Sequence, residues 1–300
     1  MSATTHHYAR AAAFALTGFT LWSISDALLK LARTAGASEG EAMLISGISG
    51  MMVLFVIAAL RGQVRKLQPH KWTGLLALGI CQCSAFVFWL VALPHMLLVK
   101  LYAVAFMTPM TVASLAALFL KEHLGISRAT AIVVGFAGVI VALNPVTIVR
   151  HHDAWIYYGA AALSMLGTAA QMLTLRVVSR NESSECTAFY PRSVLLIAGA
   201  VACAGGGFPA MTPPVFLEIC GSGALASIGW ALMSQAYKNA PAAAVAPFHY
   251  SQMLTGAFLG YLIWDSRPDI WLVMGSAIII GSGVYLILHE RRASRTMIRG

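Results

Sequence analysis

Ten apolar stretches, each close to the length of a bilayer crossing, occupy most of this 300-residue chain. A helix needs about 20 apolar residues to cross about 30 Å of hydrocarbon. With 59% hydrophobic and only 10% charged residues, the chain lies far from soluble proteins, in which roughly 25% of residues are charged. The pattern predicts an all-α integral membrane protein with ten transmembrane helices, at residues 10–32, 41–60, 73–93, 98–120, 128–145, 154–177, 187–208, 216–236, 242–264 and 270–288.

The positions of Lys and Arg predict the orientation of these helices. The apolar stretches continue to Leu288, so we expect the first to be kept as a helix and not removed as a signal peptide. If the N-terminus is cytoplasmic, 14 of the 20 Lys and Arg residues face the cytoplasm and five face the opposite side. Because positive charge concentrates on the cytoplasmic side, both termini are predicted to be cytoplasmic. The net charge of +9 then reflects topology and gives no reason to expect nucleic-acid binding.

The second half of the chain repeats the first. Sliding the sequence by 143 residues sets Ala113 and Ala117 over Gly256 and Gly260, which gives the fourth and ninth helices small-residue faces suited to close contact. Each repeat has five spans, an odd number, so the second must enter the membrane in the opposite sense. The sequence therefore predicts two inverted five-helix repeats, residues 1–148 and residues 149–300 with a basic tail, joined near 151–153.

Enzyme and metal chemistry have little support. His151, His152 and Asp153 are adjacent and lack the spacing of a zinc site, and the sequence contains no P-loop for nucleotides. Five cysteines, four of them in or beside apolar stretches, indicate no disulfide framework. We expect no cofactor, no metal and no enzyme activity. An intramembrane enzyme is the alternative from a different class, and it would need a nucleophile, a base or paired carboxylates within the bundle.

Several segments resemble the drug/metabolite transporter superfamily, in its ten-helix branch with two EamA-type repeats. The resemblance rests on Trp22–Lys30, on Phe106–Met110 with its central proline, on Leu120–His123, and on the Gly-rich run Gly135–Pro145. It covers essentially the whole chain. The resemblance implies a secondary transporter of the inner membrane that works by alternating access, with a cavity lined mainly by spans 1, 3, 4, 6, 8 and 9.

The chain departs from this family pattern at two positions. An Arg frequent in the second helix of relatives has no counterpart in residues 44–47, and Gln252 stands in the second repeat where Pro109 stands in the first. Arg192, directly after Pro191 in the seventh span, is similar to the basic residue expected of the second repeat. These departures weaken any substrate assignment taken from one particular relative.

Asp26 and Lys30 are the sharpest candidates for a substrate site. They are four residues apart on one helix, so they share a face and can pair inside the membrane. Ionisable groups in transmembrane helices usually mark substrate or ion pathways. The structural alternative is an ion pair that only holds the helix, with Lys30 reaching to the surface.

Arg192 and His249 are two further candidates. The Arg192 guanidinium could receive a carboxylate or phosphate through paired hydrogen bonds, or it could simply reach the membrane surface from its shallow position. His249 could bind substrate or titrate near neutral pH, and the alternative is a histidine held by a hydrogen bond in the bundle.

Pro109 predicts an interruption of the fourth span, because proline removes a backbone hydrogen bond and clashes with the preceding turn. A freed carbonyl beside Thr108 is acceptable where it faces a cavity. We expect Pro109 and the face formed by Gly256 and Gly260 to act in gating, with a static kink as the alternative.

The remaining candidates are aromatic, amide and hydroxyl side chains that would suit a small amphiphilic molecule. The alternative for each is simple packing or anchoring at the membrane interface. The predicted substrate-binding set therefore adds Gln82, Phe86, Trp89, Tyr102, Thr108, Gln171, Trp230, Ser234, Gln235, Tyr250 and Gln252.

Together these features predict a transporter for a small-molecule metabolite embedded in the lipid bilayer. Export of an amino acid or related zwitterion is the first expectation, because the family resemblance favours it and because aromatic rings with a paired charge suit a zwitterion. Uptake of a vitamin or nucleotide-like metabolite is the rival. Proton coupling through Asp26, and either a monomer or a homodimer, are compatible with the sequence.

Overall fold

The computed structural model describes residues 2–120, 126–143, 154–206, 211–239, 248–249 and 251–297. The elements in these ranges are all helical. They are α1 (Ser2–Thr34), α2 (Glu39–Leu60), a 3-10 helix η1 (Val64–Leu67), α3 (Trp72–Ala92), α4 (Leu98–Ala105), α5 (Thr108–Leu120), α6 (Ile126–Leu143), α8 (Ala154–Val178), α9 (Ser184–Gly206), α10 (Pro213–Asn239), α12 (Ser251–Trp264) and α13 (Ile270–Met297).

Each of the ten predicted spans contains a helix, and the signals at α2 show how its limits are set. The hydroxyl of Ser38 accepts the backbone N–H of Glu41 at 3.2 Å, and the Glu41 carboxylate accepts the backbone N–H of Ser38 at 2.8 Å. This capping box satisfies donors that have no partner within the helix. The helix stops before Gly62, whose φ of 64° suits glycine.

The fourth predicted span is interrupted. It forms α4 and α5, which are separated by Phe106 and Met107, and Pro109 lies in the first turn of α5. A proline is tolerated in a first turn because its missing N–H would have no partner there. The predicted interruption is therefore confirmed.

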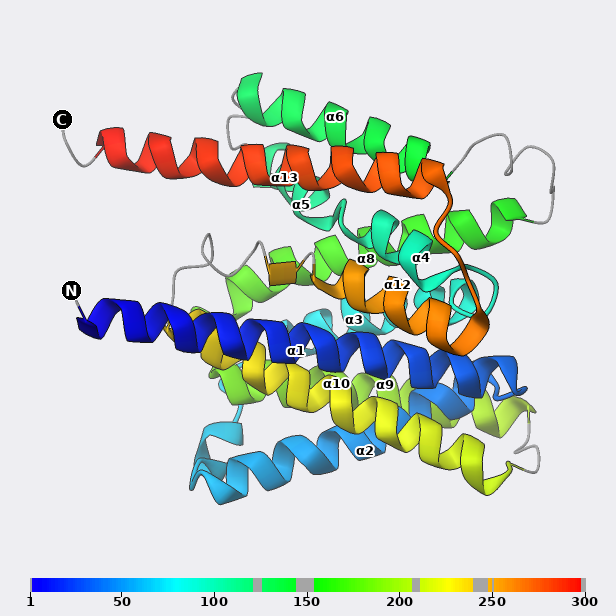
Figure 1. The fold of residues 1–300 in the computed structure, drawn as a ribbon. Helices are drawn as coiled ribbons and strands as arrows, with labels where there is room; N and C mark the ends of the chain where they lie inside the picture. The colour runs from blue at the N-terminus through cyan, green and yellow to red at the C-terminus, as the bar shows by residue number, and fades with distance from the viewer. Residues whose placement is uncertain are drawn as a thin grey trace.

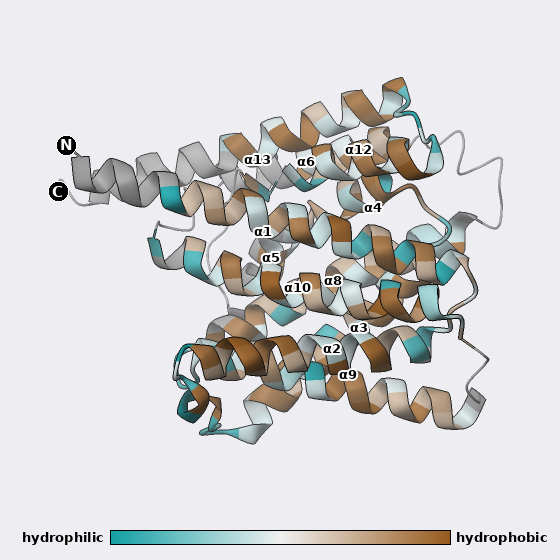
Figure 2. Ribbon diagram, turned by 60° about the horizontal axis from the view of Figure 1, so that its bottom comes forward, coloured by the Kyte–Doolittle hydropathy of each residue, from teal (hydrophilic) through white to brown (hydrophobic). Residues whose placement is uncertain are grey.

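Within the described ranges, five helices are long and apolar enough to cross a membrane: residues 10–34, 39–60, 72–92, 184–205 and 213–236. Many large apolar side chains on the outer surface are exposed, including Met52, Leu60 and Trp72. Figure 2 shows hydrophobic residues along the lengths of the outer helices. Since water would make such a surface costly, the chain is a multi-pass membrane protein whose outer side chains contact lipid.

The helices pack in pairs drawn from the two halves of the chain. α1 packs along α10, α2 along α9, α3 along α8, and α6 along α13 (Figure 1). Small residues permit close approach, as at Gly229, where an added Cβ would lie 2.7 Å from Trp22 Cδ1. The Trp22 indole N–H also donates to the carbonyl of Ala226 at 2.9 Å, which joins α1 to α10.

Both termini lie at the same end of the helix bundle (Figures 1 and 2). An even number of crossings brings a chain back to its starting side, so this arrangement fits ten spans. The seam predicted at residues 151–153 lies outside the described residues.

Candidate functional site

Asp26 lies in the C-terminal third of α1, where two neutral donors hold its carboxylate. The Tyr102 hydroxyl of α4 donates to Oδ2 at 2.8 Å, and the Trp89 indole N–H of α3 donates to Oδ1 at 3.2 Å. The two rings stack with their centroids 6.1 Å apart. Three helices therefore fix the position of this carboxylate, and no described cationic side chain lies within ion-pair distance of it.

Lys30 does not pair with Asp26, so the predicted intrahelical ion pair is wrong. The Lys30 ammonium donates to the backbone carbonyl of Met96 and lies 5.1 Å from the ring centre of Trp264. A carbonyl dipole and an aromatic face are both favourable for a buried ammonium. Tertiary contacts thus separate two charges that the helical spacing places on one face.

His249 lies close to the Asp26 region, between two aromatic rings. It stacks on Phe19 with centroids 4.5 Å apart and meets Phe106 edge to face at 5.2 Å. The Ser23 hydroxyl is 3.4 Å from the backbone carbonyl of Gln252, which it can reach as a donor. His249 and Gln252 belong to a polar part of the ninth span. Tyr250 lies between them in the sequence and is outside the described residues.

Gly256 provides the space for Tyr102. A Cβ added at Gly256 would lie 2.4 Å from Tyr102 Cε2, whereas a Cβ at Gly260 would meet only Ser266, at 3.9 Å. The two glycines predicted to share a role are therefore not equivalent. We name the residues Ser23, Asp26, Trp89, Tyr102, Phe106, His249 and Gly256 the Asp26 cluster.

Sequence reasoning missed Phe19, Ser23 and Phe106. Phe19, Ser23, Asp26 and Lys30 follow one another at intervals of four, three and four residues, which places them on a single face of α1. Phe106 follows Tyr102 by four residues across the end of α4. A helical spacing measured outward from Asp26 and Tyr102 is the signal that would have found all three.

Other predicted residues form a second polar contact farther along α3. The Gln171 side-chain amide of α8 donates to Gln82 Oε1 of α3 at 3.3 Å. Phe86 packs, partly buried, against the main hydrophobic core, and Thr108 is buried at the start of α5. The structure therefore brings these two amides together, and no contact among the described residues joins them to Asp26.

Arg192 lies away from the Asp26 cluster, between α2, α9 and α10. Its Nη1 atom is 2.6 Å from the position that a Cβ would take at Gly50, and Ser227 Oγ is 2.8 Å from the same point. Among the described residues Arg192 has no hydrogen-bond or ion-pair partner. A partly buried guanidinium thus occupies space that only a glycine leaves free.

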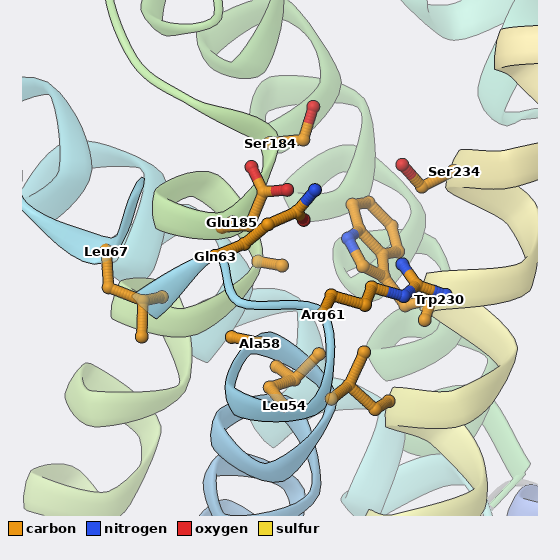
Figure 3. Close-up of a pocket in the computed structure, with 12 residues that line it drawn as sticks. Leu54, Ala58, Arg61, Gln63, Leu67, Ser184, Glu185, Trp230 and Ser234 are labelled. Carbon is orange, nitrogen blue, oxygen red and sulfur yellow. The ribbon is translucent and has the colours of Figure 1, made fainter. Parts of the chain in front are cut away.

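A pocket opens between the same three helices (Figure 3). Arg61 extends from the end of α2 toward Trp230 of α10, and Glu185 lies with Gln63 on another wall. Trp230 and Ser234, predicted as substrate residues, line this pocket and not the Asp26 cluster, while Gln235 is absent from its lining. In the described part of the chain, residues predicted for one cavity therefore lie in separate places.

Glu182, just before α9, anchors the connection between α2 and α3 beside this pocket. Its carboxylate accepts the backbone N–H groups of His70 at 2.8 Å and Lys71 at 2.5 Å. Burial acts to raise the pKa of Glu182, but these hydrogen bonds outweigh it and hold the pKa below its ordinary value. Tyr190 adds a second tie, because its hydroxyl donates to the carbonyl of Leu67 at 2.8 Å.

Several transporters are similar in sequence to this chain. An S-adenosylmethionine uptake transporter of Rickettsia bellii is 27% identical over 63% of this chain and 64% of its own length. A riboflavin transporter of Brucella anthropi is 23% identical over 82% of this chain and 87% of that protein. A pseudopaline exporter of Pseudomonas aeruginosa is 23% identical over 88% of this chain and 91% of that protein. The chain thus spans slightly less than two thirds of the first relative and most of the other two.

One solved structure, a crystal structure described only as that of a protein, shares the fold. It superposes with a TM-score of 0.66 at 18% identity, over 94% of this chain and 98% of the other. The profile of the EamA-like transporter family matches residues 9–144 and again residues 155–289. Because these matches cover nearly the whole chain, the protein belongs to the EamA-like transporter family.

Proposed function

We propose that the protein is a secondary active carrier that exports an amino acid or related zwitterion across the inner membrane by alternating access. The observation that carries the proposal is the carboxylate of Asp26, which two neutral hydrogen-bond donors hold and no described cation neutralises. A buried charge without a counter-ion is costly, so the site favours a cationic partner. An ammonium group of a substrate, or a coupled proton, would supply that charge.

The aromatic rings around Asp26 fit the rest of such a substrate. Trp89 and Tyr102 offer stacked faces beside the carboxylate, and Phe106 and His249 continue the aromatic wall. Aromatic faces attract a cation through their electrostatic quadrupole and also accept apolar groups. The cluster therefore suits a small molecule that combines an ammonium with apolar surface.

The helix pairing supports two inverted repeats, with the second half equivalent to the first. Exchanging the halves turns the α1–α10 contact into α8–α3, and the α2–α10 contact into α9–α3. The α2–α9, α6–α13 and α4–α12 contacts map onto themselves. Such a two-fold pattern is the basis on which repeats rock about a site near the bilayer midplane. Residues 1–148 and 149–300 would be the two moving units.

Gating fits the helix break in the fourth span. Phe106 and Tyr102, which belong to the Asp26 cluster, lie at or before the break, and Pro109 starts the helix after it. A change of angle between α4 and α5 would shift Tyr102 against Gly256 and so alter access to Asp26. Both termini would face the cytoplasm.

Uptake of a vitamin or nucleotide-like metabolite is the second candidate. The specific observation in its favour is that two relatives are a riboflavin transporter and an S-adenosylmethionine uptake transporter. A third relative is an exporter. Direction and substrate class therefore vary among similar proteins, and the Asp26 cluster is the better guide to this one.

A ligand screen tests the proposal directly. The purified protein is melted in the presence of amino acids, vitamins and nucleotides, because a ligand that binds the native state raises the melting temperature. We expect a saturable shift with amino acids that is lost in Asp26→Asn.

Asp265→Asn is the matched control, since Asp265 is exposed and its backbone φ of 48° suits Asn equally well. A shift with vitamins or nucleotides alone would favour the second candidate. An equal shift in Asp26→Asn would show that Asp26 is not part of the site.

A further inference from the structure

Arg192 is a charge within the helix bundle that the Asp26 cluster does not use. A guanidinium carries five N–H donors and stays charged under all ordinary conditions. None of these donors has a partner among the described residues. An unsatisfied cation within the helix bundle is costly unless an anion reaches it.

Arg192 lies one helical turn deeper than the pocket of Figure 3. Arg192 follows the lining residue Ala188 by four positions, and Gly50 and Ser227 precede the lining residues Leu54 and Ala231 by four. Residues four apart share one face of a helix, one turn or about 5.4 Å along its axis. Gly50, Arg192 and Ser227 therefore lie on the pocket-facing sides of α2, α9 and α10, respectively.

The register between α2 and α9 confirms this placement. A Cβ added at Gly47 would lie 3.2 Å from the backbone of Leu196, while Gly50 meets Arg192. Leu54 and Ala188 then line the pocket at the next level outward. The two helices thus run in opposite directions past each other, with the guanidinium directly below the pocket.

The pocket lining carries one charge of each sign, and the guanidinium of Arg192 adds a positive charge below it. Arg61 reaches into it from the end of α2, and Glu185 is the acidic residue of the lining. Ser227 is fully buried beside the guanidinium, and its hydroxyl donates to the carbonyl of Gly223 at 2.9 Å. Because that hydroxyl proton is already donated, Ser227 offers no donor to an anion, and Arg192 is the group that would bind one.

We propose that Arg192, in the space left by Gly50, forms an anion-binding site at the base of this pocket, separate from the Asp26 cluster. The group it takes is a carboxylate or a phosphate, because the planar guanidinium binds either through two parallel hydrogen bonds. A side chain at Gly50 would overlap the guanidinium and displace it from this position. The anion comes either from a soluble metabolite or from a lipid headgroup.

The test titrates inorganic phosphate into the full-length protein in phosphatidylcholine nanodiscs at constant ionic strength. Trp230 lines the pocket, so tryptophan fluorescence and the melting temperature both report binding. We expect a saturable response in the wild type. Arg192→Gln and Gly50→Ala should each weaken phosphate affinity at least tenfold, and Arg192→Lys should weaken it less.

The matched controls separate this site from the proposed transport site. Gly281→Ala should leave phosphate affinity unchanged, because a Cβ there meets no described atom within 4 Å. Asp26→Asn should also leave it unchanged, while removing any response to amino acids. Gly50→Ala retains the arginine and so keeps the test valid if Arg192→Gln fails to fold.

Replacing phosphatidylcholine with phosphatidylglycerol distinguishes the two sources of the anion. If a lipid headgroup occupies the site, phosphatidylglycerol raises the melting temperature of the wild type but not of Arg192→Gln, and it suppresses the phosphate response. If a soluble anion occupies it, the phosphate response persists in both lipids. The proposal is overturned if the wild type responds to neither, or if Arg192→Gln and Gly50→Ala bind phosphate as tightly as the wild type.

Discussion

Asp26 and Arg192 are both membrane-embedded charges, yet the structure satisfies them in different ways. Two neutral donors from α3 and α4 hold the carboxylate of Asp26 in one orientation. The guanidinium of Arg192 has no hydrogen-bond partner among the described residues, and a glycine makes the space that it occupies. The carboxylate of Asp26 is held in place but not neutralised, so it can bind a cation. The guanidinium of Arg192 has no protein partner among the described residues, so an anion would stabilise it. The comparison predicts a cation at Asp26 and an anion at Arg192.

We expect the largest loss of ligand affinity from Asp26→Asn. A hydrogen bond between charged groups contributes about 1.5–3 kcal/mol, which corresponds to roughly 10- to 100-fold in affinity. We expect that loss for the ligand that stabilises the wild type, measured by isothermal titration calorimetry. Unchanged affinity would mean that the carboxylate is structural and that the two charges do not differ in function.

Gly256→Ala should damage the Asp26 cluster through packing alone. The added methyl would overlap Tyr102, which is held on its other side by Asp26 and Trp89. Overpacking of this kind destabilises a core by about 1–3 kcal/mol.

Gly260→Ala is the matched control for this substitution, because its methyl meets only Ser266 at ordinary contact distance. It should be neutral or slightly stabilising, since Ala favours a helix by about 1 kcal/mol over Gly. Thermal unfolding of both variants in the same detergent measures the difference. Equal melting temperatures would show that Tyr102 can move freely.

Tyr102→Phe and Tyr190→Phe give a pair of similar deletions in the two regions. Each removes one hydroxyl donor at 2.8 Å, from Asp26 in the first case and from the Leu67 carbonyl in the second. A lost hydrogen bond costs about 1 kcal/mol of stability. We expect similar losses of stability, with reduced amino-acid binding only in Tyr102→Phe and reduced phosphate binding only in Tyr190→Phe. Exchanged or identical ligand effects would contradict the separation of the sites.

The smallest expected effect is a pH dependence of the connection between α2 and α3, which Glu182 anchors. The pKa of Glu182 is lowered in the folded protein, so its stabilising contribution is complete above the ordinary value of 4.5. That contribution is lost as the pH falls further, through the lowered folded pKa. We expect lower hydrogen-exchange protection of the His70 and Lys71 amides below pH 4.5, measured against the intrinsic exchange rate at each pH, with little change near Asp26.

Glu182→Gln should remove this pH dependence, because the amide does not titrate in this range. Glu185→Gln, three residues along the chain and without these backbone contacts, should leave it unchanged. A pH dependence that survives in Glu182→Gln would assign the anchoring of residues 61–71 to another group.

The sequence determined the number and order of the helices, because the requirement for about 20 apolar residues acts on each span locally. It also determined the break before Pro109, since the backbone chemistry of proline acts within one turn. Capping at Ser38 is another local signal of this kind. The candidates Asp26, Arg192, Trp89 and Tyr102 could be chosen because charged and aromatic groups in apolar helices are unusual.

Only the tertiary structure decided which of these residues meet. Spacing along α1 favoured Lys30 as the partner of Asp26, yet the ammonium contacts Met96 and Trp264, from segments 66 and 234 positions away. Trp230 and Ser234 line the pocket of Figure 3 and do not belong to the Asp26 cluster, because α10 packs on both α1 and α2. A periodic pattern specifies the face on which a side chain lies, but the partner across that face depends on the packing of helices far apart in the chain.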